Sequence, residues 1–235
     1  MTHTTVETGA APAPMGLLAR LVGIITAPTD TYRSVVTHPR WLGMLALTTL
    51  FTVGMTTGFM LTEVGQNAWL DSVLTGSAAP EQVQAMERVA PFAGYIAGVS
   101  ILVAAPLMLL VVAGILFAVF NAALGGTATF KQIFTVAVHA GAIGVLAQLF
   151  TVPLNYMRES LTSSTSLAVM LPMLEPNSFA AKFAGAIDLF LIWQVVVLAI
   201  GLGVLYRRRT QPIAMSLLAI YFLIAVIIAA VTSGS

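Results

Sequence analysis

Residues 95–124 read YIAGVSILVAAPLMLLVVAGILFAVFNAAL and contain no charged side chain. An α-helix rises about 1.5 Å per residue and the hydrocarbon core of a bilayer is about 30 Å thick, so about 20 apolar residues suffice for one crossing. This stretch is longer, and Pro106 stands near its middle. We therefore expect one helix that is kinked at the proline or begins outside the bilayer, rather than two crossings.

Four other apolar runs have a length suited to one crossing. Together they predict five membrane-spanning helices, at about residues 41–61, 95–124, 133–154, 184–206 and 213–231. The composition agrees, because 58% of the 235 residues are hydrophobic and only 8% are charged, whereas a soluble domain has about 45–50% apolar and about 25% charged residues. We predict an all-α, polytopic membrane protein whose five-helix transmembrane domain occupies residues 41–232.

Residues 16–40 precede the first span and are too short to cross the membrane. Apolar residues recur there at helical spacing, and Pro28 divides the segment into two short amphipathic helices. We expect both helices to lie in the membrane interface, where Arg20, Arg33 and Arg40 would contact anionic headgroups. The alternative is that their apolar stripe packs against the protein's own bundle.

The basic residues are distributed unevenly between the two ends of the expected spans, and such residues stay on the cytoplasmic side. With the N-terminus inside, the cytoplasmic set is Arg20, Arg33, Arg40, Lys131, Arg207, Arg208 and Arg209, and the external set is Arg88, Arg158 and Lys182. Acidic residues gather in the two long external loops. Residues 1–15, rich in Thr, Ala and Pro, are then a disordered cytoplasmic tail, and the C-terminus lies outside.

Few polar side chains fall within the expected spans, and each is a candidate for an ion or solute path. Lys131, Thr135 and His139 share one face of the third span and could form a polar track from the cytoplasm. A lone histidine bonded to a neighbouring helix is the simpler interpretation. Gln148 and Asn155 lie on another face, toward the outer leaflet, where interhelical hydrogen bonding is the usual role of such residues.

Charged residues also lie near both ends of the fourth span. Asp188 lies near its outer end, where it can reach water, Arg158 or Lys182, and its shallow depth favours a structural role over transport. The triplet at residues 207–209 is chiefly a stop and orientation signal, and an anionic-lipid site is the alternative.

Two pairs of glycines indicate where helices pack closely. Gly54 with Gly58, and Gly94 with Gly98, both fit the G-x-x-x-G pattern that lets helix backbones approach each other. We expect both pairs to be packing sites within the fold.

Several classes of protein are excluded. The absence of cysteine rules out disulfides, thiolate nucleophiles and Cys-ligated metals, and a net charge of +1 gives no field to attract nucleic acid. The chain has no H-E-x-x-H, G-x-S-x-G or P-loop motif, and His3, His38 and His139 are dispersed. An intramembrane aspartyl protease needs two carboxylates, and only Asp188 lies within a span. We expect no catalysis, no cofactor and no metal site.

Four stretches together resemble the Yip1 family of five-span membrane proteins, in its bacterial branch. They are PTDTY at residues 28–32 with HPRW at 38–41, APEQ at 79–82, GGTATFKQ at 125–132, and DLFLIW at 188–193 followed by GLG at 201–203. The similarity covers nearly everything after residue 16, in the expected order.

The resemblance implies a role in organising membranes or their proteins. Eukaryotic relatives sit in early secretory membranes and are linked to Rab GTPases and vesicle traffic, whereas bacterial members have no settled biochemical role. We expect a non-catalytic scaffold or accessory subunit in a bacterial cytoplasmic membrane, whose partners are the bilayer and other membrane proteins or a second copy. A GTPase partner is expected only in a eukaryote. The alternative is a small-solute or lipid transporter that uses the polar face of the third span.

Overall fold

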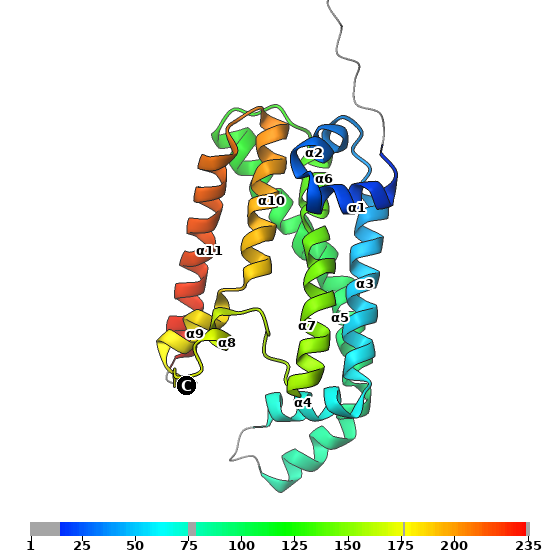
Figure 1. The fold of residues 1–235 in the computed structure, drawn as a ribbon, viewed down its shortest axis with the longest axis vertical. Coiled ribbons are helices and arrows are strands. Elements are labelled where there is room, and N and C mark those ends of the chain that lie inside the picture. Colours follow the sequence, from blue (N-terminus) through cyan, green and yellow to red (C-terminus); the bar gives the residue numbers. More distant parts are fainter. Residues whose placement is uncertain (1–14, 75–78, 176, 234–235) are drawn as a thin grey trace, which may run out of the picture.

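The computed structural model describes residues 15–74, 79–175 and 177–233, and within them it contains helices and no β-strand (Figure 1). The expected tail, except Met15, and the last residue, Ser235, lie outside the described residues. The helices are α1 (Leu17–Thr26), α2 (Pro28–Thr37), α3 (Leu42–Met60), α4 (Glu63–Val73), α5 (Pro80–Phe117), the π-helical segment η1 (Ala118–Ala123), α6 (Phe130–Ala140), α7 (Ala142–Arg158), α8 (Leu167–Met170), α9 (Phe179–Ala186), α10 (Leu189–Tyr206) and α11 (Thr210–Thr232).

Five helical segments are long and apolar enough to cross a membrane, which confirms the expected fold class. They are α3, α5 continued by η1, α6 continued by α7, α10 and α11. The second segment begins at Pro80, so the helix of the preceding loop and the span are one continuous helix. Proline suits the first turn of a helix because its missing N–H has no helical partner there. The third segment is interrupted at Gly141, between α6 and α7.

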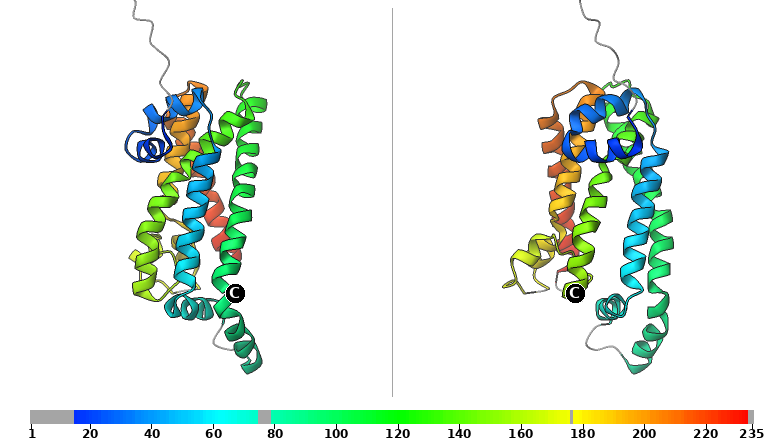
Figure 2. Two further views of the ribbon diagram at one scale, coloured as in Figure 1. Left: turned by 90° about the vertical axis from the view of Figure 1, so that its right-hand side faces the viewer. Right: turned by 45° about the vertical axis from the view of Figure 1, so that its right-hand side comes forward.

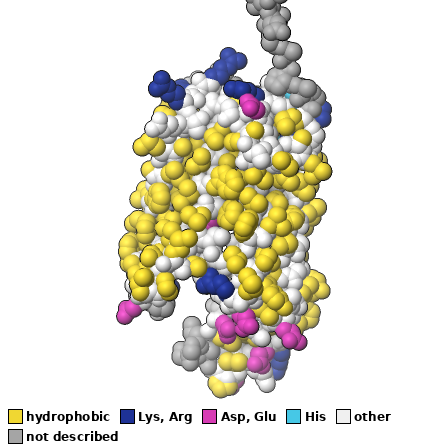
Figure 3. All heavy atoms as spheres, viewed as in Figure 1, with side chains coloured by type: hydrophobic (Ala, Val, Ile, Leu, Met, Phe, Trp, Pro, Cys, Tyr) yellow, Lys and Arg dark blue, Asp and Glu magenta, His cyan; other side chains and the backbone are white. Residues whose placement is uncertain are grey.

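The third span lies at the centre of the molecule, between α3 and α5 on one side and α10 and α11 on the other (Figure 2). In the most apolar 18 residues of the third span 61% are buried, whereas the buried share in the corresponding stretches of the other four spans is 11–28%. Apolar side chains therefore cover most of the outside, as a lipid-facing surface requires. Figure 3 shows this apolar band between two polar ends.

The two ends differ in charge, and we name them accordingly. The basic end holds α1, α2 and the turns before α6 and α11, with all seven basic residues of the expected cytoplasmic set. The acidic end holds α4, α8, α9 and the start of α5. Both names refer only to the structure and assign neither end to a side of the membrane.

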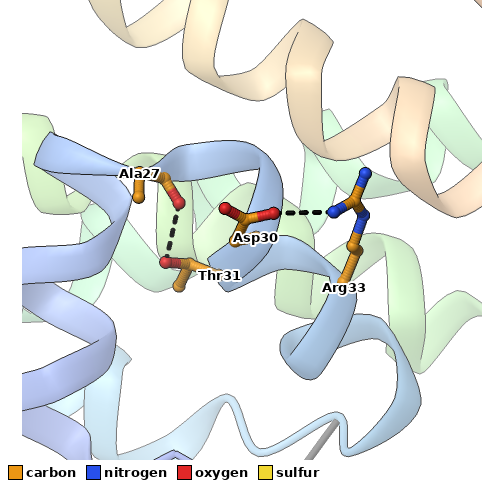
Figure 4. Close-up of polar contacts among 4 residues, drawn as sticks. All are labelled: Ala27, Asp30, Thr31 and Arg33. Carbon is orange, nitrogen blue, oxygen red and sulfur yellow. Dashed lines mark hydrogen bonds and ion pairs between the residues drawn. The ribbon is translucent and has the colours of Figure 1, made fainter. Parts of the chain in front are cut away.

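Helices α1 and α2 lie across the basic end and pack on the bundle. Ile24, Tyr32 and Val35 are buried in the main core with residues of α6 and α10. The corner between the two helices is tight, because Gly23 lies directly against the Thr31 hydroxyl. That hydroxyl donates to the Ala27 carbonyl at 2.9 Å (Figure 4). The alternative interpretation of these helices, packing against the protein's own bundle, is therefore the correct one for their inner face.

The two glycine pairs behave differently. Gly94 and Gly98 of α5 lie against α3, where a Cβ at Gly98 would come 2.5 Å from the Thr57 hydroxyl. The Thr57 hydroxyl donates to the Gly94 carbonyl at 3.2 Å. Gly54 and Gly58 of α3 instead face open space, since a Cβ added at either glycine would meet no atom within 4 Å among the described residues. The expectation of internal packing is therefore wrong for Gly54 and Gly58.

Candidate functional site

Arg20 of α1 points into the bundle and is only 8% exposed. Its Nη1 atom donates to the Arg40 carbonyl at 2.6 Å and lies 3.1 Å from His139 Nε2. The expectation that Arg20 faces lipid headgroups is therefore wrong. α1 turns Leu18 and Val22 outward, which places Arg20 on the inner face, where Nη1 has two acceptors while the buried Nε has no hydrogen-bond partner among the described residues.

The contacts of His139 define its protonation state. Nδ1 lies 2.8 Å from the Thr135 carbonyl, which can only accept, so Nδ1 carries hydrogen. Nε2 faces Arg20, which can only donate, so Nε2 is unprotonated. His139 is thus neutral and bridges two fixed partners, one on its own helix and one on α1.

The three residues of the expected polar track do not form an open path. The Thr135 hydroxyl donates to the Lys131 carbonyl at 2.6 Å, while Thr135 and His139 are both 0% exposed. Lys131 is exposed at the start of α6. The polar atoms of Thr135 and His139 are therefore hydrogen-bonded to backbone carbonyls and to Arg20, and they do not line an open path for a solute.

Tyr32 fastens α2 to the same region. Its hydroxyl donates to the Val136 carbonyl at 3.3 Å, and its ring lies against Gly201 of α10. Gln132 adds a second link, because its side chain donates to the Val36 carbonyl at 3.2 Å. The helices that precede the first span are thus part of the core and close the basic end.

A second polar cluster lies at the acidic end around Asp188. Its Oδ1 accepts from the backbone N–H groups of Phe190 at 2.8 Å and Leu191 at 3.2 Å, which caps α10. Its Oδ2 accepts from the hydroxyls of Ser163 at 2.7 Å and Thr165 at 2.5 Å. Burial by itself raises the pKa of Asp188, but the hydrogen bonds outweigh burial and hold the pKa below the usual carboxyl value.

The expected partners of Asp188 are not the observed ones. Among the described residues the structure has a single ion pair, between Arg33 and Asp30 at 2.7 Å, and it is exposed (Figure 4). The sequence did not point to Ser163 and Thr165, because a Ser/Thr-rich loop has no pattern that singles out two hydroxyls.

Tyr221 and Asn155 extend this cluster to other helices. The Tyr221 hydroxyl accepts from the Asp188 N–H at 3.0 Å and donates to the Ala186 carbonyl at 2.7 Å. The Asn155 side chain lies 2.5 Å from the Ser164 hydroxyl. Gln148, the other residue expected on that face of the third span, is partly buried on α7.

Other candidate positions lie on the surface or around a hollow. Arg33, Arg40 and residues 207–209 are exposed at the basic end. A hollow of about 260 Å³ is bordered by Thr48, Thr49 and Thr52 of α3 and Gln194 of α10, with α5 on another side. In the described part of the chain, no three His, Asp or Glu side chains gather as metal ligands do.

Comparisons with known proteins indicate a family and a bacterial relative. The model of the Yip1 domain matches residues 22–232. The membrane protein YknW of Bacillus subtilis (strain 168) is 26% identical over 193 residues, which cover 77% of this chain and 76% of YknW. No solved structure matches the chain.

Proposed function

From the premise that this chain belongs to the Yip1 family of integral membrane proteins, we propose that it is a non-catalytic scaffold or accessory subunit. In this role it organises partner proteins, or the membrane around them. Its partners are the bilayer and other membrane proteins or a second copy of the chain. A GTPase partner belongs to the proposal only if the chain comes from a eukaryote.

The observation that carries this proposal is the large apolar surface left outside the bundle. Leu223, Ile227 and Val231 form a stripe along α11, and all three are more than half exposed. Helix α11 packs on α10 and α9, which leaves this stripe free for another helix. Within a bilayer, helices associate through close packing and interhelical hydrogen bonds rather than through the hydrophobic effect, so such stripes can hold a partner span or lipid.

A second stripe with the same character runs along α5. Val99, Val103 and Leu107 are also more than half exposed and lie one turn apart. The two stripes are on different spans, since α5 packs chiefly on α3 and α6 whereas α11 packs on α10 and α9. This arrangement supports a protein that contacts neighbours through two different spans.

The closed interior at the basic end supports the non-catalytic part of the proposal. Thr135 and His139 are buried; the polar contacts of Thr135 lie within α6, and His139 also contacts Arg20 of α1. We further propose that the basic end faces the cytoplasm of a bacterial cell, with the N-terminus inside and the C-terminus outside, because basic residues stay on that side. Arg33 and Arg40 would then lie at the level of the anionic headgroups.

The test is purification from the native membrane after mild crosslinking, with mass spectrometry of what co-purifies near stoichiometrically. Two triple variants locate the contact: L223A/I227A/V231A on α11 and V99A/V103A/L107A on α5, each serving as the matched control for the other. We expect a reproducible partner whose recovery falls in one triple variant and not in the other. Recovery as a solitary monomer, with no membrane assembly altered by deletion of the protein, would overturn the proposal.

The second candidate function is a small-solute or lipid transporter, which the hollow bordered by Thr49 and Gln194 favours. A path through it would continue toward Gln148 on the third span. The protein in sealed vesicles would then move solute or lipid, and Gln194→Ala or Gln148→Ala would lower the flux. Equal flux in vesicles with and without the protein would reject this candidate.

A further inference from the structure

An apolar groove of about 350 Å³ lies at the basic end between the end of the second span and the start of the fifth. One wall is formed by Ile115, Val119 and Leu124, and the other by Ile213, Leu217 and Ile220. The groove exists because α11 packs on α10 and α9, whereas α5 packs chiefly on α3 and α6. The two helices therefore leave a furrow between them that opens toward the membrane.

The wall on the second span is not ordinary α-helix. Val119 belongs to η1, where the backbone widens into a π-helical turn. Such turns are rare and are frequent at functional sites. The segment is anchored at its end by the Arg208 side chain, which donates to the Leu124 carbonyl at 3.3 Å.

Cationic side chains border the groove at its polar end. Arg208 and Arg209 line it, and Arg208 also lines an adjoining polar hollow of about 520 Å³, formed with residues 125–128 and 205–207. Arg207, Arg208 and Arg209 are exposed, and none has a carboxylate partner within the described ranges. Arg209 is the N-cap of α11, where the helix dipole adds positive potential, whereas Arg207 is the C-cap of α10, whose dipole favours a cation. Three adjacent cations in this position are best stabilised by an anion.

We propose that this groove binds one anionic phospholipid, with an acyl chain between α5–η1 and α11 and the phosphate against Arg208 and Arg209. The dimensions fit, because the α11 wall from Pro212 to Ile220 is about 12 Å long, which is most of the hydrocarbon depth of one leaflet of a bilayer about 30 Å thick. The apolar walls match the chain and the arginines match the phosphate. This inference does not depend on the proposed scaffold function.

The test uses the full chain in detergent and native mass spectrometry, with titration by phosphatidylglycerol or by phosphatidylcholine of the same acyl chains. We expect one phosphatidylglycerol molecule to bind in preference to phosphatidylcholine. The double variant R208Q/R209Q should weaken this binding about 25-fold, that is, about fivefold for each arginine. S216F, which fills the groove and keeps both arginines, should also remove the bound lipid.

The matched control is Arg88→Gln, which removes one exposed arginine charge at the acidic end, outside the groove. It should leave the affinity unchanged. A photoreactive phosphatidylglycerol should attach to peptides covering residues 115–124 and 212–220 in the unmodified chain, which gives a readout that needs no variant to fold. Equal binding of the two lipids, an equal loss in R88Q, or attachment elsewhere would overturn the proposal.

Discussion

Nη1 of Arg20 lies 3.1 Å from Nε2 of His139, although 119 positions separate the two residues in the chain. The contact joins a helix that does not cross the membrane to the buried centre of the third span. It offsets part of the cost of burying a cationic side chain at 8% exposure, since Nη1 donates both to this nitrogen and to the Arg40 carbonyl, whereas Nε has no hydrogen-bond partner among the described residues.

His139→Leu should destabilise the protein by about 1.5–3 kcal/mol, because it leaves the buried Arg20 charge without one of its acceptors. The measurement is unfolding in detergent by heat or by SDS. The double variant R20M/H139L should recover most of this loss, since replacing both partners by apolar groups of similar size removes the unsatisfied charge. Strictly additive effects of R20M and H139L would show that the two side chains do not interact.

Asp188 should make stability depend on pH in the acid range. Its pKa is lowered in the folded state, so its contribution is complete above the unfolded value of about 3.9. That contribution is lost as the pH falls through the lowered folded value. Asp188→Asn keeps an α10 cap but loses the charge that accepts from Ser163 and Thr165, so at pH 7 it should cost about 1.5 kcal/mol.

The check on Asp188 is a series of melting curves in detergent from pH 7 to pH 3. Wild type should lose stability more steeply at the acid end than D188N. Glu175→Gln, which removes an exposed carboxylate from the same end of the molecule, is the control for general charge effects. Parallel curves for wild type and D188N would contradict the prediction.

Gly201→Ala should destabilise the protein by about 1–3 kcal/mol through overpacking. Its new methyl group would lie 2.5 Å from Val136 and 2.8 Å from the Tyr32 ring. Gly54→Ala is the matched control, because the same methyl group meets no described atom within 4 Å. Melting temperatures in one detergent should fall for G201A and hold or rise for G54A, and the reverse order would refute the packing argument.

The proposed orientation predicts a simple labelling pattern, since the chain contains no cysteine. A membrane-impermeant maleimide should label Asp71→Cys, at the acidic end, in intact cells. It should label Thr29→Cys, at the basic end, only after the membrane is opened. Both positions are exposed, and the unmodified chain is the blank. Labelling of T29C but not D71C in intact cells would invert the topology.

Much of the fold could be predicted because a membrane span is a local property of the chain. About 20 consecutive apolar residues suffice to define one, so the expected five spans and the fold class agree with the structure. The resemblance to the Yip1 family also follows from the sequence, because four short stretches occur in the order found in the family, and the family comparison confirms it. The boundaries were less exact, as the helix from Pro80 shows.

The candidate sites were harder to predict because their partners are far apart in sequence. The sequence pattern places Arg20 at the headgroups, since an arginine on a short amphipathic helix usually faces them. Ser163 and Thr165 pair with Asp188 across 25 and 23 positions. No spacing rule connects residues at such distances.

The sequence by itself thus determined that the protein lies in a lipid bilayer, how many spans it has and to which family it belongs. Each of these conclusions rests on local hydrophobicity or on short stretches of residues. Only the tertiary structure decided which span is central, which face of α1 points inward and where a groove meets the arginines of residues 207–209. The physical reason is that a membrane span carries apolar residues both on the side that faces lipid and on the side that faces the bundle. Its inner face is therefore selected by close packing and by the few polar groups that find partners, and not by a hydrophobic pattern.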